Sequence, residues 1–111
     1  MSPKQRAQTA QAFRAAVNLK AAELEAWLKT EASRSVGWVR AGEKESIGHQ
    51  SGRRIVQILR KPKAALSDED YAHMRKVVGF IRRHLAQRPG GDVMHSRWRY
   101  SLLNWGHDPL K

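Results

Sequence analysis

The sequence contains no cysteine and no long apolar run. The first absence excludes disulfide bonds and thiolate metal sites, and it fits a reducing compartment. The second absence argues against a signal peptide, which needs an apolar stretch, and against a membrane-spanning helix, which needs roughly 18 apolar residues. We therefore expect a cytoplasmic protein that makes no use of a membrane.

Strand-like alternation of apolar and polar residues is also missing, and apolar positions recur instead at steps of three and four. With 111 residues and 41% apolar content, the chain is long enough for one core and too apolar for wholesale disorder. We predict an all-α fold, a compact single-domain bundle of four or five helices over residues 1–111, with residues 1–4 disordered.

Apolar spacing, capping residues and helix breakers predict where the helices lie. The predicted helical ranges are 5–30, with a break allowed near 18–20, then 52–61, 68–87 and 95–105. Residues 33–50 are rich in glycine and serine, and we predict a loop there that Trp38 anchors in the core. Ser51 is the predicted N-cap of the helix that ends before Pro62.

Acidic residues are scarce relative to basic ones, and the net charge is +11. Residues 1–52 contain eight basic and five acidic residues, whereas residues 53–111 contain thirteen and five. A field of this size favours an anionic partner, and the excess of arginine over lysine suits forked contacts with phosphate. We predict that the partner is nucleic acid.

Two clusters of basic residues are candidates for phosphate contacts. The run from Arg53 to Lys63 includes five cations and no acidic residue, and the 68–87 helix carries four more, Arg75 among them. If these helices pack as neighbours, their cations form one phosphate-binding surface; otherwise they are two solvated faces. The residues predicted to bind nucleic acid are Arg53, Arg54, Arg60, Lys61, Lys63, Lys76, Arg82 and Arg83. A candidate anion site at the predicted helix start comprises Ser51, Gly52 and Arg53.

Catalytic and metal-binding patterns are weak. The glycine-rich segment 42–54 lacks the spacing of a nucleotide-binding loop. Glu45, Ser46 and His49 would make a hydrolase triad only in a geometry that the sequence does not specify. The five histidines lack the short spacings of metal sites. We predict a non-catalytic protein with no cofactor and no metal.

Aromatic residues and arginine interleave in the C-terminal segment 98–109, a pattern that allows stacking on bases. Trp98 and Trp105 share a helical stripe with Leu102, however, so both indoles are predicted to pack in the core. The residues of this region on a different face, which are the better contact candidates, are Arg97, Tyr100 and Asn104.

A family resemblance covers most of residues 17–110. The matching stretches are 24–30, 42–56, 71–79, 83–89 and 98–109. The second includes Gly-Glu-Lys-Glu-Ser-Ile-Gly-His-Gln-Ser-Gly-Arg-Arg, and the last reads Trp-Arg-Tyr-Ser-Leu-Leu-Asn-Trp-Gly-His-Asp-Pro. In these stretches the chain resembles a family of short, uncharacterised bacterial and fungal proteins, some of which carry a DNA-binding label. The resemblance implies association with DNA and brings no catalytic residues.

The favoured interpretation is a nucleoid-associated protein that binds duplex DNA through its phosphates with little sequence preference. A base-reading recognition helix is not predicted, because the helix beginning at residue 68 starts with three acidic residues that phosphates would repel. Two alternatives stay open. One is a protein-interaction or stress-associated module whose basic face docks an acidic partner, and the other is a small enzyme using the loop Glu43–Ser51.

Overall fold

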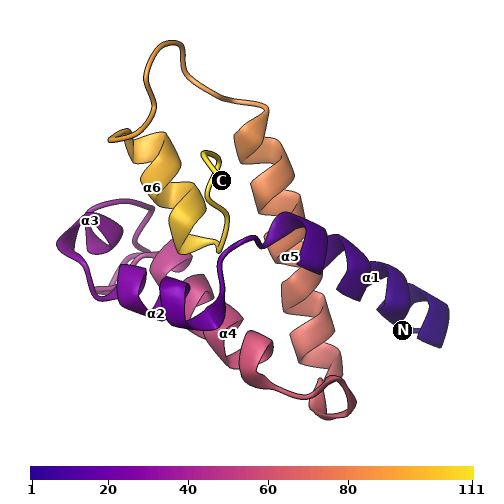
Figure 1. Ribbon diagram of the computed structural model, residues 1–111. Coiled ribbons are helices and arrows are strands. Elements are labelled where there is room, and N and C mark those ends of the chain that lie inside the picture. The colour runs from indigo at the N-terminus through magenta and orange to yellow at the C-terminus, as the bar shows by residue number, and fades with distance from the viewer.

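The computed structural model describes residues 1–111 and contains six α-helices and no strand (Figure 1). The helices are α1 (Pro3–Ala16), α2 (Ala21–Leu28), α3 (Glu31–Arg34), α4 (Ile47–Arg60), α5 (Asp68–Leu85) and α6 (Arg97–Asn104), and a short 3-10 helix, η1 (Lys63–Ala65), precedes α5. The predicted all-α class is confirmed, with one helix more than the upper estimate. No helix has the length and apolar content needed to cross a membrane.

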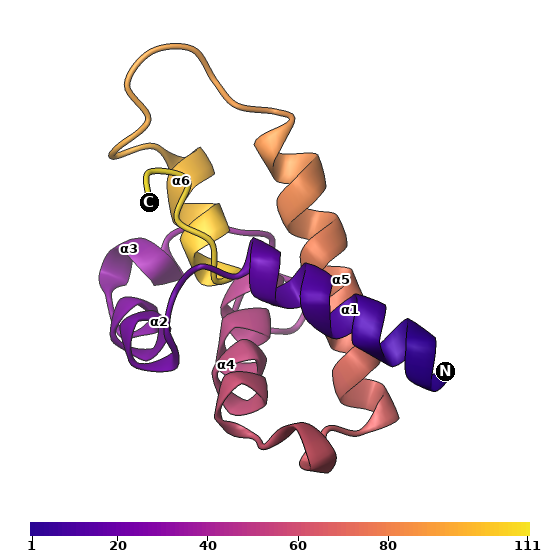
Figure 2. The same cartoon turned by 45° about the vertical axis from the view of Figure 1, so that its right-hand side comes forward.

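Two helix pairs and a central short helix make up the body of the molecule. Helix α1 packs along α5, and α2 packs along α4, as Figures 1 and 2 both show. Helix α6 contacts α2, α3, α4 and α5, so it joins the two pairs together with the direct contact between α4 and α5. The segment between α5 and α6 arches away from this body (Figure 2).

The predicted helix 5–30 is two helices, separated at the break that was allowed near 18–20. Val17 takes an extended conformation and ends α1. Asn18 then exchanges two hydrogen bonds with the Asp108 backbone, at 2.9 and 2.7 Å. Helix α2 restarts after Lys20, whose backbone N–H donates to the Glu23 carboxylate. The C-terminal segment therefore holds the break in place.

The expected disorder of residues 1–4 is not what the structure shows. Ser2 caps α1 and forms a capping box with Gln5, in which each side chain accepts a hydrogen bond from the other residue's backbone N–H. Pro3 follows at the first helical position, where a missing N–H costs nothing. The helix accordingly begins at Pro3.

The predicted start of the next helix, with Ser51 as its N-cap, is wrong by five residues. Helix α4 begins at Ile47, and Ser46 caps it by accepting a hydrogen bond from the His49 N–H. A β-carbon on Gly52 would lie 2.6 Å from both the Asn104 carbonyl oxygen and a Leu28 methyl. Glycine lowers helix propensity, yet here it allows α4 to approach α2 and α6 closely. Packing therefore overrides the local signal that predicted a loop.

The core follows most of the predicted helical stripes, although Leu85, at the end of α5, is exposed. Leu24, Ile55 and Leu102 are completely buried, and both Trp98 and Trp105 are buried as predicted. Trp38, predicted to anchor the loop in the core, is instead 70% exposed. The Ile47 N–H donates to the Trp38 carbonyl and Gly37 before it has a φ of +95°, so the loop backbone places the indole at the surface.

Asn104, predicted as a contact residue, is a buried structural group. Its side chain is about 1% exposed. Its Oδ1 accepts hydrogen bonds from Trp27 Nε1 at 2.7 Å and from Ser33 Oγ at 2.5 Å, and its Nδ2 donates to the Ser33 carbonyl. The residue therefore ties α2 and α3 to α6. Arg97 is exposed and Tyr100 half-buried, so these two candidates stay at the surface.

Candidate nucleic-acid interface

The basic run on α4 is free of acidic residues in sequence but not in space. Arg53 makes a forked pair with Glu45, at 2.8 and 2.6 Å. Arg60 makes a second forked pair with Glu25 of α2, at 2.8 and 3.3 Å. The hydrogen bond from Arg53 is the main reason that the pKa of Glu45 falls to about 2. At neutral pH both arginines are therefore matched by ionised carboxylates.

The end of the same run meets the first turn of α5. Lys61 Nζ lies 2.7 Å from Asp70 Oδ2, and Arg54 makes a longer contact of 3.5 Å with the other oxygen. The ammonium of Lys61, together with the Ser67 backbone N–H, lowers the pKa of Asp70 to about 2. Lys63, in η1, has no carboxylate partner. Four of the five cations of this run are thus paired, and Lys63 is not.

The candidate anion site at Ser51, Gly52 and Arg53 is not a helix start. Because α4 begins at Ile47, these residues lie beyond the first turn, where backbone N–H groups are used within the helix. Ser51 and Gly52 are buried, and Ser51 Oγ lies 2.9 Å from His73 Nε2. The site as predicted therefore has no free backbone donors for an anion.

The cations of α5 are arranged differently from those of α4. Arg75, Lys76, Arg82 and Arg83 are all exposed, and none forms an ion pair. Arg75 and Arg82 are seven residues apart, as are Lys76 and Arg83, so each pair spans about 10.5 Å along the helix on nearly the same side. The helix therefore presents two parallel rows of free positive charge, one toward α1 and one toward α6.

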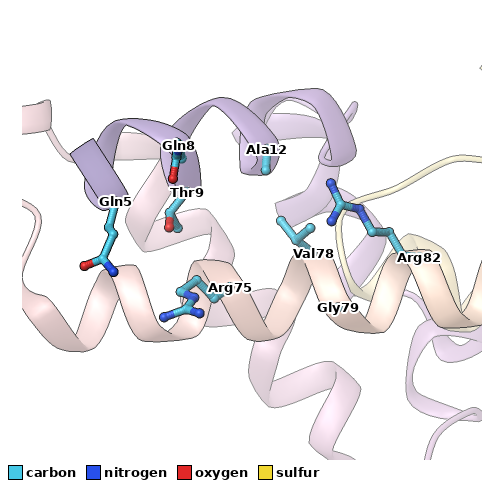
Figure 3. A pocket seen from close by; sticks show the side chains of 8 residues that line it. All are labelled: Gln5, Gln8, Thr9, Ala12, Arg75, Val78, Gly79 and Arg82. Atoms are coloured by element: carbon cyan, nitrogen blue, oxygen red, sulfur yellow. The ribbon is translucent and has the colours of Figure 1, made fainter. Parts of the chain in front are cut away.

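The row facing α1 borders a groove between α1 and α5, with a volume of about 380 Å³. Figure 3 shows Gln5 and Thr9 pointing from α1 toward α5, and Arg82 reaching from α5 toward the end of α1. Arg75 and Gln8 complete the polar lining, and no carboxylate contributes to it. Guanidinium, amide and hydroxyl donors together are the groups that contact phosphate oxygens.

The row facing α6 borders two hollows that meet at Lys76 and Ile47. The first, the basic hollow, has a volume of about 310 Å³. Its lining comprises Arg40, Ile47, Gln50, Ser51, Arg53, Arg54, His73 and Lys76. Burial and then the charges of Arg54 and Lys76 lower the pKa of His73 to about 4. His73 is therefore neutral at pH 7, and the basic hollow repels a further positive charge.

The second, the aromatic hollow, has a volume of about 360 Å³. The rings of Phe80 and Trp105 form part of its lining and are stacked 4.2 Å apart with a 14° angle between their planes. Trp38, Lys76 and Arg83 also line it. This hollow could not be predicted from the sequence, because its walls come from three separate segments.

The eight predicted contact residues thus do not form one surface. Arg53, Arg54 and Lys76 share the basic hollow, and Arg83 lies with Lys76 at the aromatic hollow. Arg82 faces the α1–α5 groove on the other side of α5, and Arg60 lies in a fourth depression, between α2 and α4.

Glu45, Ser46 and His49 lie close together but not as a relay. His49 Nδ1 contacts the Glu45 carboxylate, and His49 Nε2 lies 2.7 Å from the Leu28 carbonyl oxygen. Ser46 Oγ accepts from the backbone N–H of His49 rather than approaching the ring. Both ring nitrogens are therefore occupied, and neither is placed to take a proton from Ser46. No group of three potential metal ligands is found in the structure.

Residues 12–103 match a family described as a protein of unknown function, DUF3140. The matched range includes the C-terminal end of α1 from residue 12, all of α2 to α5 and nearly all of α6. The chain belongs to the DUF3140 family. No curated protein and no solved structure matches it. The paired cations of α4, the free cations of α5 and the basic hollow all lie within the matched range. Most of the lining of the aromatic hollow and of the α1–α5 groove lies within it too. The lining residues outside the range are Asn104 and Trp105 in the aromatic hollow and Gln5, Gln8 and Thr9 in the groove.

The depressed pKa of His73 predicts that acid destabilises this DUF3140 protein. Between about pH 6.5 and 4 the unfolded chain binds a proton at this residue and the folded protein does not, so the free energy of unfolding falls as the pH falls. His84, whose pKa burial also lowers, adds to the loss. A His73→Gln variant should show a smaller drop in thermal midpoint from pH 7 to pH 5 than the wild type.

The matched control is His95→Gln, which replaces an exposed histidine. It should keep the pH dependence of the wild type. If His73→Gln and the wild type lose stability in parallel over this range, the proton linkage assigned to His73 is wrong.

Proposed function

We propose that this protein binds nucleic acid, with duplex DNA as the favoured form, through phosphate contacts from α5 and without catalysing a reaction on it. The observation that carries the proposal is the pairing pattern of the cations. Arg75, Lys76, Arg82 and Arg83 have no carboxylate partner, whereas most cations of α4 do. The DNA-binding label that comes with the sequence resemblance points to the same class of partner.

Free cations are better phosphate ligands than paired ones. A phosphate that binds Arg53 or Arg60 must displace or share a forked carboxylate, whereas one that binds Arg82 displaces only water and counterions. Contacts of this kind carry no base information, so little sequence preference is expected. Such a protein would associate with the nucleoid in the cytoplasm.

The test is the salt dependence of binding to a fluorescent DNA duplex, measured by anisotropy. Four phosphate contacts should give a log–log slope of about −4, with dissociation constants of about 10⁻⁶–10⁻⁴ M at physiological salt. An affinity that does not change with salt would rule out the phosphate contacts. Polyglutamate of similar charge is the control, and tighter binding to it than to DNA would favour an acidic protein partner instead.

A further inference from the structure

The exposed side chain of Trp38 is held on a well-fixed backbone. The Trp38 carbonyl accepts a hydrogen bond from the Ile47 N–H at 2.9 Å, which ties it to the start of α4. Gly37 has a φ of +95° and lies so close to Ser46 that a β-carbon would be 3.0 Å away. The indole is 70% exposed, although tryptophan is largely buried in most folds. The backbone of the loop therefore holds the indole at the surface.

Trp38 stands at the aromatic hollow, opposite surfaces that suit a flat ring. Phe80 and Trp105 give the hollow a stacked aromatic wall, and Ile47 adds an aliphatic one. A volume of about 360 Å³ falls in the range of about 300–1,000 Å³ that is usual for small-molecule sites. An aromatic group placed here would bury its faces against apolar side chains and remove Trp38 from water.

The charge around the aromatic hollow is of one sign. Lys76 and Arg83 line it, and no carboxylate does. Lys76, which has no carboxylate partner, also lines the basic hollow, together with Arg54 and Arg40, which are paired with Asp70 and Glu43. A ligand that fits both hollows therefore has a flat aromatic part and, beside it, a negatively charged part.

We propose that the aromatic hollow binds an unpaired base of a nucleic-acid strand, while the phosphate attached to that nucleotide binds at Lys76 in the basic hollow. This inference rests on the proposed function, because the neighbouring phosphates of the same strand lie along α5. Inorganic phosphate would leave the aromatic wall unused, and a neutral aromatic ligand would leave Lys76 and Arg83 unused. A nucleotide uses both.

The experiment compares two fluorescent single strands of equal length, an oligodeoxyadenylate and its abasic counterpart. They carry the same phosphates, so the ratio of their affinities isolates the contribution of the bases. Stacking of one base predicts that the wild type binds the oligodeoxyadenylate about tenfold more tightly. The ratio should stay constant as salt rises, because base stacking releases no counterions.

Trp38→Ala should bring this ratio close to one, while binding to the abasic strand stays as in the wild type. Val39→Ala is the matched control, since Val39 is the adjacent residue, is 41% exposed and does not line the aromatic hollow. It should keep the tenfold ratio. A ratio near one in the wild type, or an unchanged ratio in Trp38→Ala, would overturn the base site.

These outcomes separate the base site from the phosphate contacts of α5. A ratio near one with steep salt dependence for both strands would overturn the base site alone. A tenfold ratio with salt-independent affinities would support stacking in the aromatic hollow and overturn the phosphate contacts, both at Lys76 and along α5.

Discussion

The free energy of unfolding of an Asn104→Ala variant is expected to be about 3–5 kcal/mol lower than that of the wild type. The substitution removes one side chain but leaves three buried polar groups without a partner: Trp27 Nε1, Ser33 Oγ and the Ser33 carbonyl. Each unsatisfied buried group costs about 1–3 kcal/mol, and partial access of water at Trp27 reduces the total. Urea unfolding followed by circular dichroism measures the change.

The control for Asn104→Ala lies on the same helix. Arg97 is exposed and donates a single hydrogen bond to the Ser35 carbonyl, so Arg97→Ala should cost no more than about 1 kcal/mol. If Asn104→Ala were as stable as Arg97→Ala, the hydrogen bonds of Asn104 would not be what holds α2 and α3 against α6.

Helix positions that depend on neighbouring residues were predictable from the sequence. The start of α5 is an example, since Ser67 accepts from the Asp70 N–H and the Asp70 carboxylate accepts from the Ser67 N–H. Gly106, with a φ of +85°, follows the end of α6 as expected for a helix stop. Both signals act within one helical turn, so no knowledge of the fold is needed to interpret them.

The start of α4 was not predictable in this way. Gly48 and Gly52 are loop signals in the sequence, but in the fold they are the residues that let α4 touch Trp105, Leu28 and the Asn104 backbone. Whether a glycine breaks a helix or lets two helices approach depends on the partner, which is far away in the chain. The position of Trp38 also depends on the fold, because the Ile47 N–H at the start of α4 donates to its carbonyl while the indole lies at the surface.

The ion pairs that the cations form could not be predicted from the sequence either. Glu25 is 35 residues from Arg60, and Asp70 is 16 residues from Arg54, so a run that looks acid-free is paired once the chain folds. A charge count describes the field far from the protein. Which cations are free for a ligand is decided by ion pairs that form only in the folded state.

This distinction leads to a comparison between two pairs of arginines with the same formal charge. Arg75→Gln with Arg82→Gln neutralises two free cations on the α1–α5 groove, and it leaves the aromatic hollow untouched. Each lost phosphate contact should reduce the salt slope by about one and weaken duplex binding about tenfold at low salt, so the double variant should lose about a hundredfold. Anisotropy titrations over a range of salt concentrations measure both quantities.

Arg53→Gln with Arg60→Gln is the matched variant, since it also removes two positive charges. These arginines are already neutralised by Glu45 and Glu25, so duplex affinity should fall only a few-fold and the slope should change little. Their ion pairs are exposed and contribute little to stability, so both double variants should remain folded at the titration temperature. Equal losses from the two variants would mean that net charge alone governs binding, and that the free cations of α5 have no special part in it. A larger loss from the α4 pair would mean instead that DNA displaces Glu45 and Glu25, which would move the interface from α5 to α4.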